Sequence, residues 1–177
     1  MIKTVLVAVD GSDHARKALS LAADIAAKYR ARMVLLHVLM ANVRSETLRK
    51  LASRGGLSKR QRDRLDNYEV DTQMAMAEAG AAVGFVPIPA PRELLEAIGR
   101  QVLDRAERAA RKAGVTKLST VLSGSDPADA ILEAAKREKA DMIVLGSRGL
   151  GDLKGFFLGS VSHKVGAHAE CTCVTVK

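Results

Sequence analysis

Five short apolar runs alternate with amphipathic segments along this chain, and that alternation is the strongest constraint on its fold. The first run, Thr4 to Val9, is apolar or β-branched throughout, which is the composition of a strand buried on both faces. Strands that alternate with helices form a parallel sheet with helices on both faces, joined by right-handed crossovers. We therefore predict one doubly wound, five-stranded parallel α/β domain. The other runs lie at 32–38, 118–122, 141–146 and 173–176.

Helical spacing and capping residues mark the segments between the runs. Ser12 and Asp13 can cap a helix whose apolar residues recur every three or four positions. The same periodicity predicts helices over 93–113 and 161–168. Asp126 before a proline is a typical start of another helix, because it combines a side-chain cap with proline at the first helical position.

A glycine-rich segment follows the fourth run and leads into the last predicted helix. Glycines let a backbone turn sharply and approach a ligand closely, because no Cβ intervenes. The hydroxyl of Ser160 and the free N–H groups of the helix that begins there can hold a phosphate. The segment therefore indicates a phosphate-binding loop, and the alternative is an ordinary glycine-rich surface turn. It reads Gly146-Ser147-Arg148-Gly149, then nine residues, then Gly159-Ser160.

The sequence of this segment, GSRGLGDLKGFFLGSVS, resembles the nucleotide-binding branch of the universal stress protein family, which carries the spacing Gly-x2-Gly-x9-Gly-[Ser/Thr]. Residues 2–12 are similar to that family's first strand and turn, 35–38 to its second strand, and 124–127 to its turn into the third helix. The resemblance covers residues 1–40 and about 91–177. It implies the strand order 3-2-1-4-5, which places strands one and four side by side where the order reverses. Ligands of such sheets bind outside the carboxyl ends of the strands at that point.

The resemblance also implies which residues bind the nucleotide, which is ATP or AMP in this family. Val38 matches the position whose backbone meets the adenine edge, and Arg148 is either a phosphate contact or a solvated loop arginine. Ser162 matches a further hydroxyl position. The positions that match the family's phosphate and ribose loop are Gly146, Gly149, Gly159, Ser160 and Val161.

Asp10 directly follows the first buried run and has two interpretations. It can cap the first helix or brace the turn. It can also bind the ribose hydroxyls, or an Mg²⁺ ion carried by the phosphates, because a carboxylate suits both; the resemblance favours this role. His37, at the end of the second run, is interpreted as a buried, hydrogen-bonded histidine rather than a catalyst.

Three functions of different classes are open at this stage. The resemblance favours a binding module, a cytoplasmic stress-response protein that holds ATP or AMP and regulates or protects through its nucleotide state. The second is a slow ATPase or nucleotidyl-transfer enzyme. Since the sequence has no Gly-x4-Gly-Lys-[Ser/Thr], no Ser/His/Asp spacing and no metal motif, we expect no catalytic residue and slow turnover or none. The third, a nucleic-acid or acidic-partner adaptor, is least favoured because its basic segment offers no aromatic stacking platform.

Composition indicates the class of protein and its expected location. The chain is 47% hydrophobic and 27% charged, as in soluble globular proteins. Its apolar runs are strand-sized, which predicts no membrane span, and its first residues do not resemble a signal peptide, so we expect a cytoplasmic location. Cys171 and Cys173 are expected to be small buried side chains rather than a redox pair or a soft-metal site.

Residues 41–90 lie outside the resemblance and are longer than an ordinary strand-to-helix connection. We treat them as a helical insertion in a single domain of residues 1–177, with a helix over 58–82, a shorter one before it, and a stiff proline-rich link over 85–91. Residues 41–64 carry +6 of the net charge of +8. A cover over the nucleotide, a dimer arm and a mobile flap are all open roles, and the basic stretch either faces the phosphates, is a solvated face or binds a partner.

The resemblance finally implies a homodimer that pairs through the last strand. The run Cys173 to Val176 would otherwise leave an apolar sheet edge unpaired. No membrane partner is expected, nucleic acid is disfavoured, and a further protein partner stays open.

Overall fold

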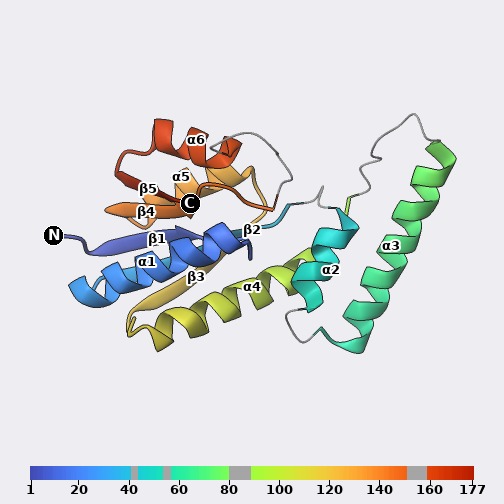
Figure 1. The fold of residues 1–177 in the computed structure, drawn as a ribbon, viewed down its shortest axis with the longest axis horizontal. Helices are drawn as coiled ribbons and strands as arrows, with labels where there is room; N and C mark the ends of the chain where they lie inside the picture. Colours follow the sequence, from blue (N-terminus) through green and yellow to red (C-terminus); the bar gives the residue numbers. More distant parts are fainter. Residues whose placement is uncertain (41–43, 54–56, 80–88, 151–158) are drawn as a thin grey trace. The chain divides into compact units, whose positions relative to one another are not determined.

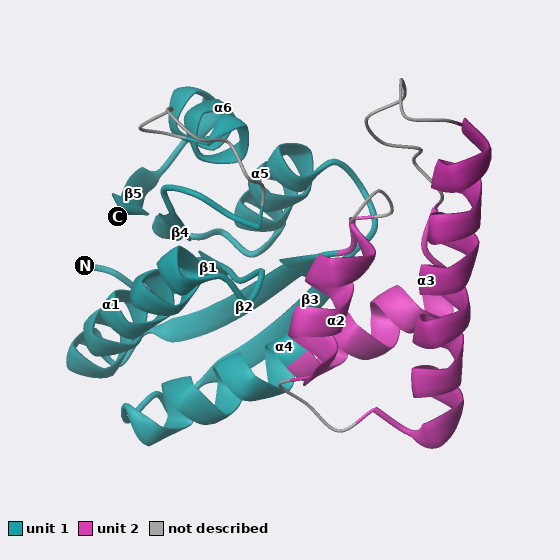
Figure 2. Ribbon diagram, turned by 45° about the vertical axis from the view of Figure 1, so that its right-hand side comes forward, with its two compact units in different colours: residues 1–38, 102–177 teal, residues 39–101 magenta. Residues whose placement is uncertain are grey.

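The computed structural model of the chain describes residues 1–40, 44–53, 57–79, 89–150 and 159–177 (Figure 1). Its contacts group into two compact units, which Figure 2 draws in different colours. Helix α4 (Arg92–Lys112) contributes its first half to unit 2 and its second half to unit 1. Unit 1 consists of Met1–Val38 and Val102–Lys177, and unit 2 consists of Leu39–Gln101.

Unit 1 is a parallel sheet with helices on both faces (Figure 1). The strand order is β3-β2-β1-β4-β5, so the predicted doubly wound fold and its order are confirmed. The order reverses between β1 and β4, which pair in parallel with Val7 opposite Val144. The elements in chain order are β1 (Thr4–Ala8), α1 (Asp13–Tyr29), β2 (Arg32–Val38), the second half of α4, β3 (Leu118–Ser123), α5 (Pro127–Arg137), β4 (Met142–Gly146), α6 (Ser160–His168) and β5 (Thr172–Val176).

The central strands are buried because helices cover them from both sides. Leu6 lies in a core cluster with residues of α5 and α6, including Ile131 and Val165. Helix α1 packs on the opposite face (Figure 1), and its buried side is mostly alanine, which lets helix and sheet approach closely. This two-sided burial explains why β1 and β4 read as continuous apolar runs.

The predicted capping residues hold the helix starts. The Ser12 hydroxyl accepts a hydrogen bond from the Ala15 N–H at 3.2 Å and caps α1. The Asp126 carboxylate accepts bonds from the N–H groups of Ala128 and Asp129 at 3.1 and 3.3 Å, ahead of proline in α5. The backbone bond from Asp129 is the main reason that the pKa of Asp126 lies below its ordinary value.

Some boundaries and burials differ from the sequence-based expectation. Helix α6 and strand β5 each begin one residue earlier than predicted. Cys171 and Cys173 are free thiols and only partly buried, because β5 is the outermost strand of the described sheet. Even so, burial raises the pKa of both thiols, which makes them poor nucleophiles. Most of the predicted proline-rich link, 85–88, lies outside the described residues.

Unit 2 is helical, as predicted for the insertion. It contains α2 (Ser45–Ser53), α3 (Lys59–Ala79) and the first half of α4. Helices α2 and α3 pack together through buried side chains that include Leu51 and Leu65. No helix in the described part of the chain is long and apolar enough to cross a bilayer.

Candidate functional site

The candidate site lies in unit 1, at the carboxyl ends of β1 and β4. Asp10 follows β1, and the loop that begins at Gly146 follows β4. Because these strands are neighbours in a parallel sheet, both loops leave the same edge. This is the point where the strand order reverses.

The Asp10 carboxylate meets the β4 loop directly. Its Oδ1 accepts a hydrogen bond from the Ser12 N–H at 2.8 Å, across a turn in which Gly11 has a φ of 84°. Its Oδ2 lies only 2.6 Å from the place where a Cβ on Gly149 would stand. Asp10 therefore braces the turn with one oxygen, while Ser12 caps the helix. The second oxygen has no hydrogen-bond partner within the described ranges and faces the glycine-rich loop.

Gly146 is required by packing at the strand end. A Cβ on this residue would lie 2.8 Å from the His14 Cβ and 2.9 Å from the Ala15 nitrogen. The first turn of α1 thus presses against the end of β4. This contact accounts for the first glycine of the motif without a ligand.

A buried hydrogen-bond network closes the loop behind Gly149. The Gly159 N–H donates to the Ser147 carbonyl at 2.7 Å. The Ser162 hydroxyl lies within hydrogen-bond distance of the carbonyls of Ser147 and Gly159, at 3.1 and 2.9 Å. The Ser147 N–H donates to the Val176 carbonyl at 2.7 Å, which ties the loop to β5. These bonds bring the two ends of the loop together, although residues 151–158 between them lie outside the described part.

Ser147 was missed by the sequence reasoning, whereas Ser162 was expected as a further hydroxyl position of the site. Both are buried, with exposed fractions of 1% and 3%. Ser147 lies inside the motif but carries no spacing signal of its own, because its contribution comes from its backbone groups. The buried hydroxyl of Ser162 contacts the loop carbonyls, so its evident role is to hold the loop.

No described side chain caps the N-terminus of α6. Gly159 is its N-cap residue with an extended backbone and supplies no side-chain cap, and the first turn contains no acidic residue. The first N–H groups of a helix lack intrahelical partners and carry partial positive charge. Ser160 is exposed and Val161 is half-buried at this terminus, and Arg148 is exposed on the loop nearby.

The end of β2 completes the edge on the other side of β1. Val38 is half-buried there and pairs with Ser123 of β3. The ring of His37 is 6% exposed, and its Nδ1 lies 2.7 Å from the Val9 carbonyl, which makes Nδ1–H the donor. Burial is the main reason that the pKa of His37 lies below its ordinary value. The interpretation of His37 as a buried, hydrogen-bonded histidine is confirmed, and the bond joins β2 to the strand end that carries Asp10.

The described residues contain no cluster of three or more His, Cys, Asp or Glu side chains that could hold a metal ion. Among the described residues of this edge, Asp10 offers a carboxylate oxygen that could bind a metal ion together with oxygens of a ligand, as with a nucleotide-bound Mg²⁺.

These features define a doubly wound α/β protein whose candidate ligand site lies at its topological switch point. The chain belongs to the universal stress protein family, whose family model matches residues 1–177. The match confirms membership of the family, and it extends over residues 41–90, which the sequence reasoning had left outside. A universal stress protein of Thermus aquaticus is 33% identical over 181 residues, which cover 100% of both chains.

Solved structures of the family share this fold. A universal stress protein in complex with cAMP aligns with a TM-score of 0.59 at 23% identity and covers 99% of this chain and 96% of its own. The universal stress protein from Archaeoglobus fulgidus in complex with dAMP aligns with a TM-score of 0.56 at 20% identity, covering 100% of this chain and 98% of its own.

Proposed function

We propose that this protein binds an adenine nucleotide, ATP or AMP, at the carboxyl ends of β1 and β4. One observation carries the proposal: the carboxylate of Asp10 and the backbone of Gly149 lie against each other, at the edge where the strand order reverses. A Cβ at position 149 would collide with this carboxylate, so the glycine lets the loop approach Asp10 closely, beside an oxygen that no described residue binds. The loop then leads to a helix terminus suited to phosphate.

The proposal gives each part of the edge a role. The phosphates contact the loop backbone at Gly149 and Gly159 and the N–H groups at Ser160 and Val161. The Asp10 Oδ2 accepts a hydrogen bond from a ribose hydroxyl, or binds an Mg²⁺ ion on the phosphates. The other candidates, Val38 for the adenine edge, Arg148 for phosphate, and Gly146 and Ser162 for the shape of the loop, complete the set. The relatives solved in complex with cAMP and dAMP support an adenine nucleotide as the ligand.

The role that fits this site is regulation or protection through the nucleotide state rather than rapid catalysis. Among the described residues of this edge, His37 is buried and bonded to a carbonyl, and no lysine of the P-loop type accompanies the loop. We expect slow hydrolysis or none, because no described residue of this edge is positioned as a base for an attacking water. The rest of the proposal comprises a single family domain over 1–177 with its insertion, a cytoplasmic location, and a homodimer formed through β5. The position of β5 as the outermost strand supports this last point.

The direct test is to identify what the purified protein carries. Denaturing the protein and analysing the supernatant by chromatography and mass spectrometry should reveal an adenine nucleotide, or the emptied protein should bind ATP or AMP in calorimetry. If the emptied protein binds neither ATP, AMP, cAMP nor adenosine at millimolar concentration, the proposed function is wrong.

A further inference from the structure

The second half of helix α3 carries a short apolar stripe on the side opposite to the one it buries. Its buried residues include Leu65 and Tyr68, which pack within unit 2. Val70 and Met74 are 52% and 59% exposed, and Ala77 is exposed as well. Their spacing of four and three residues places them on one stripe. At about 100° per residue, this stripe points roughly opposite to the buried side.

The charges of α3 are divided between its two ends. The first six residues, 59–64, contain four Lys or Arg and one Asp, a net charge of +3. The remaining residues, 65–79, contain four Asp or Glu and no Lys or Arg, a net charge of −4. This order opposes the helix dipole, which favours acidic residues at the N-terminus and basic residues at the C-terminus. The arrangement therefore does not stabilise α3 as an isolated helix.

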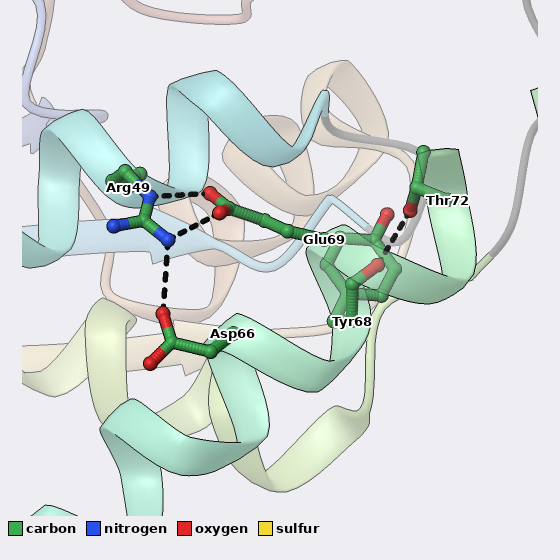
Figure 3. A network of polar contacts seen from close by, with 5 residues as sticks. All are labelled: Arg49, Asp66, Tyr68, Glu69 and Thr72. Atoms are coloured by element: carbon green, nitrogen blue, oxygen red, sulfur yellow. Dashed lines mark hydrogen bonds and ion pairs between the residues drawn. The ribbon is translucent and has the colours of Figure 1, made fainter. Parts of the chain in front are cut away.

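Part of this charge is used inside unit 2. Arg49 of α2 donates to Asp66 at 2.9 Å and to Glu69 at 2.6 Å, and Thr72 donates to the Tyr68 carbonyl one turn along (Figure 3). Arg64 pairs with Glu93 of α4 in the same unit. These contacts fix α3 in unit 2 by its inner side.

Besides Arg62 and Asp63 near the basic end, four charges face solvent at opposite ends of the helix. Lys59 and Arg60 are exposed at the basic end, and Asp71 and Glu78 are exposed at the acidic end. None of the four has an ion pair with any residue in the described ranges. Each end of the exposed side is thus complementary to the other end of an identical helix.

From this pattern we infer that α3 pairs in an antiparallel manner with α3 of a second copy of the chain. The midpoint of Lys59–Ala79 is Glu69, so Arg60 and Glu78 each lie nine residues from it on opposite sides. An antiparallel pair related by a two-fold axis brings Arg60 of one copy beside Glu78 of the other, twice. It also buries Val70 and Met74 near the axis. The two helix dipoles then lie antiparallel, which is their favourable arrangement side by side. A helix of this length, about 32 Å, offers several turns of contact.

The residues of this surface belong to unit 2, whereas β5 and the residues of the candidate nucleotide site belong to unit 1. If α3 alone pairs, the protein is a dimer; if the β5 edges pair as well and the two interfaces close on themselves, it is a tetramer. In either case, disrupting α3 halves the mass of the assembly.

The experiment measures the molar mass of the full-length protein by sedimentation equilibrium. Val70→Glu with Met74→Glu should halve the mass, and circular dichroism should show unchanged helix content because both side chains are exposed. Arg92→Glu changes the net charge by the same −2 (from +1 to −1) on an exposed residue of α4, so it is the matched control and should leave the mass unchanged. A wild-type protein that is monomeric at about 100 µM, or a mass unchanged by the double substitution, overturns the inference.

Charge reversal tests the antiparallel arrangement itself. Arg60→Glu and Glu78→Arg should each weaken association by about tenfold, because each reverses two symmetry-related pairs. The two substitutions together should restore it, and the loss in the single variants should shrink at 1 M salt. If the double variant associates no more tightly than the single variants, the helices do not pair in this antiparallel arrangement.

Discussion

Replacing Gly149 by alanine tests the contact on which the site is built. The new Cβ would lie 2.6 Å from the Asp10 Oδ2, and an ordinary contact begins at 3.4 Å. The carboxylate must therefore retreat by about 0.8 Å. Since the obstacle is the end of a side chain and position 149 is exposed, we expect the fold to survive with a loss of about 0.5–1.5 kcal/mol, the cost of an off-rotamer side chain.

The substitution should cost more free energy of nucleotide binding than free energy of unfolding. A hydrogen bond to a charged group contributes about 1.5–3 kcal/mol, which corresponds to an affinity about 10-fold to 150-fold weaker once Asp10 is displaced. Calorimetric titration with ATP and with adenosine distinguishes the two roles of Asp10. Weaker binding of both ligands indicates a ribose contact, and weaker binding of Mg-ATP alone indicates a metal contact.

Gly124→Ala is the matched control, because a Cβ at position 124 meets no atom within 4 Å. It should bind ATP as the wild type does. If Gly149→Ala also binds ATP and adenosine within twofold of the wild type, Asp10 and Gly149 do not form the ligand site.

Three further outcomes follow from the same geometry. Gly159→Val should abolish ATP binding while the protein still folds, since its Cβ would lie 3.2 Å from the Ser147 carbonyl oxygen at the loop closure; unchanged affinity in calorimetry would contradict this. Gly166→Ala, inside α6 with no atom within 4 Å, should raise the free energy of unfolding in urea by about 0.5–1 kcal/mol, and a decrease would show that the space is occupied. Because burial lowers the pKa of His37 below 6.5, the unfolded chain binds its proton first; stability should be full above pH 6.5 and fall by up to about 1.4 kcal/mol per pH unit below it. A His37→Gln variant should lose this component, and an identical pH profile of urea midpoints would refute the assignment.

The sequence predicted the parts of the fold that depend on periodicity and capping. Continuous apolar runs identified the central strands because two-sided burial leaves no polar face. Asp126 located the start of α5 through its cap. The juxtaposition of Asp10 with the β4 loop required the strand order, which came from the family resemblance and not from the spacing.

The sequence could not predict contacts made by backbone groups between distant segments. The bond from Ser147 to Val176 depends on the tertiary path of the loop and leaves no periodic trace. The role of Gly146 in packing against α1 has the same origin, since any close approach favours glycine, whether by a ligand or by a helix. The partial exposure of Cys173 follows from the edge position of β5, which is a property of the whole sheet.

The most direct measurement of the central claim is a titration of ¹⁵N-labelled protein with ATP, followed by amide chemical shifts. The account predicts that the largest shifts fall on the turn at Asp10 and on the amides of Gly149, Gly159, Ser160 and Val161. A titration with AMP should shift the same amides, with smaller shifts at the N-terminus of α6. Shifts confined to unit 2, or none at millimolar ATP, would contradict it.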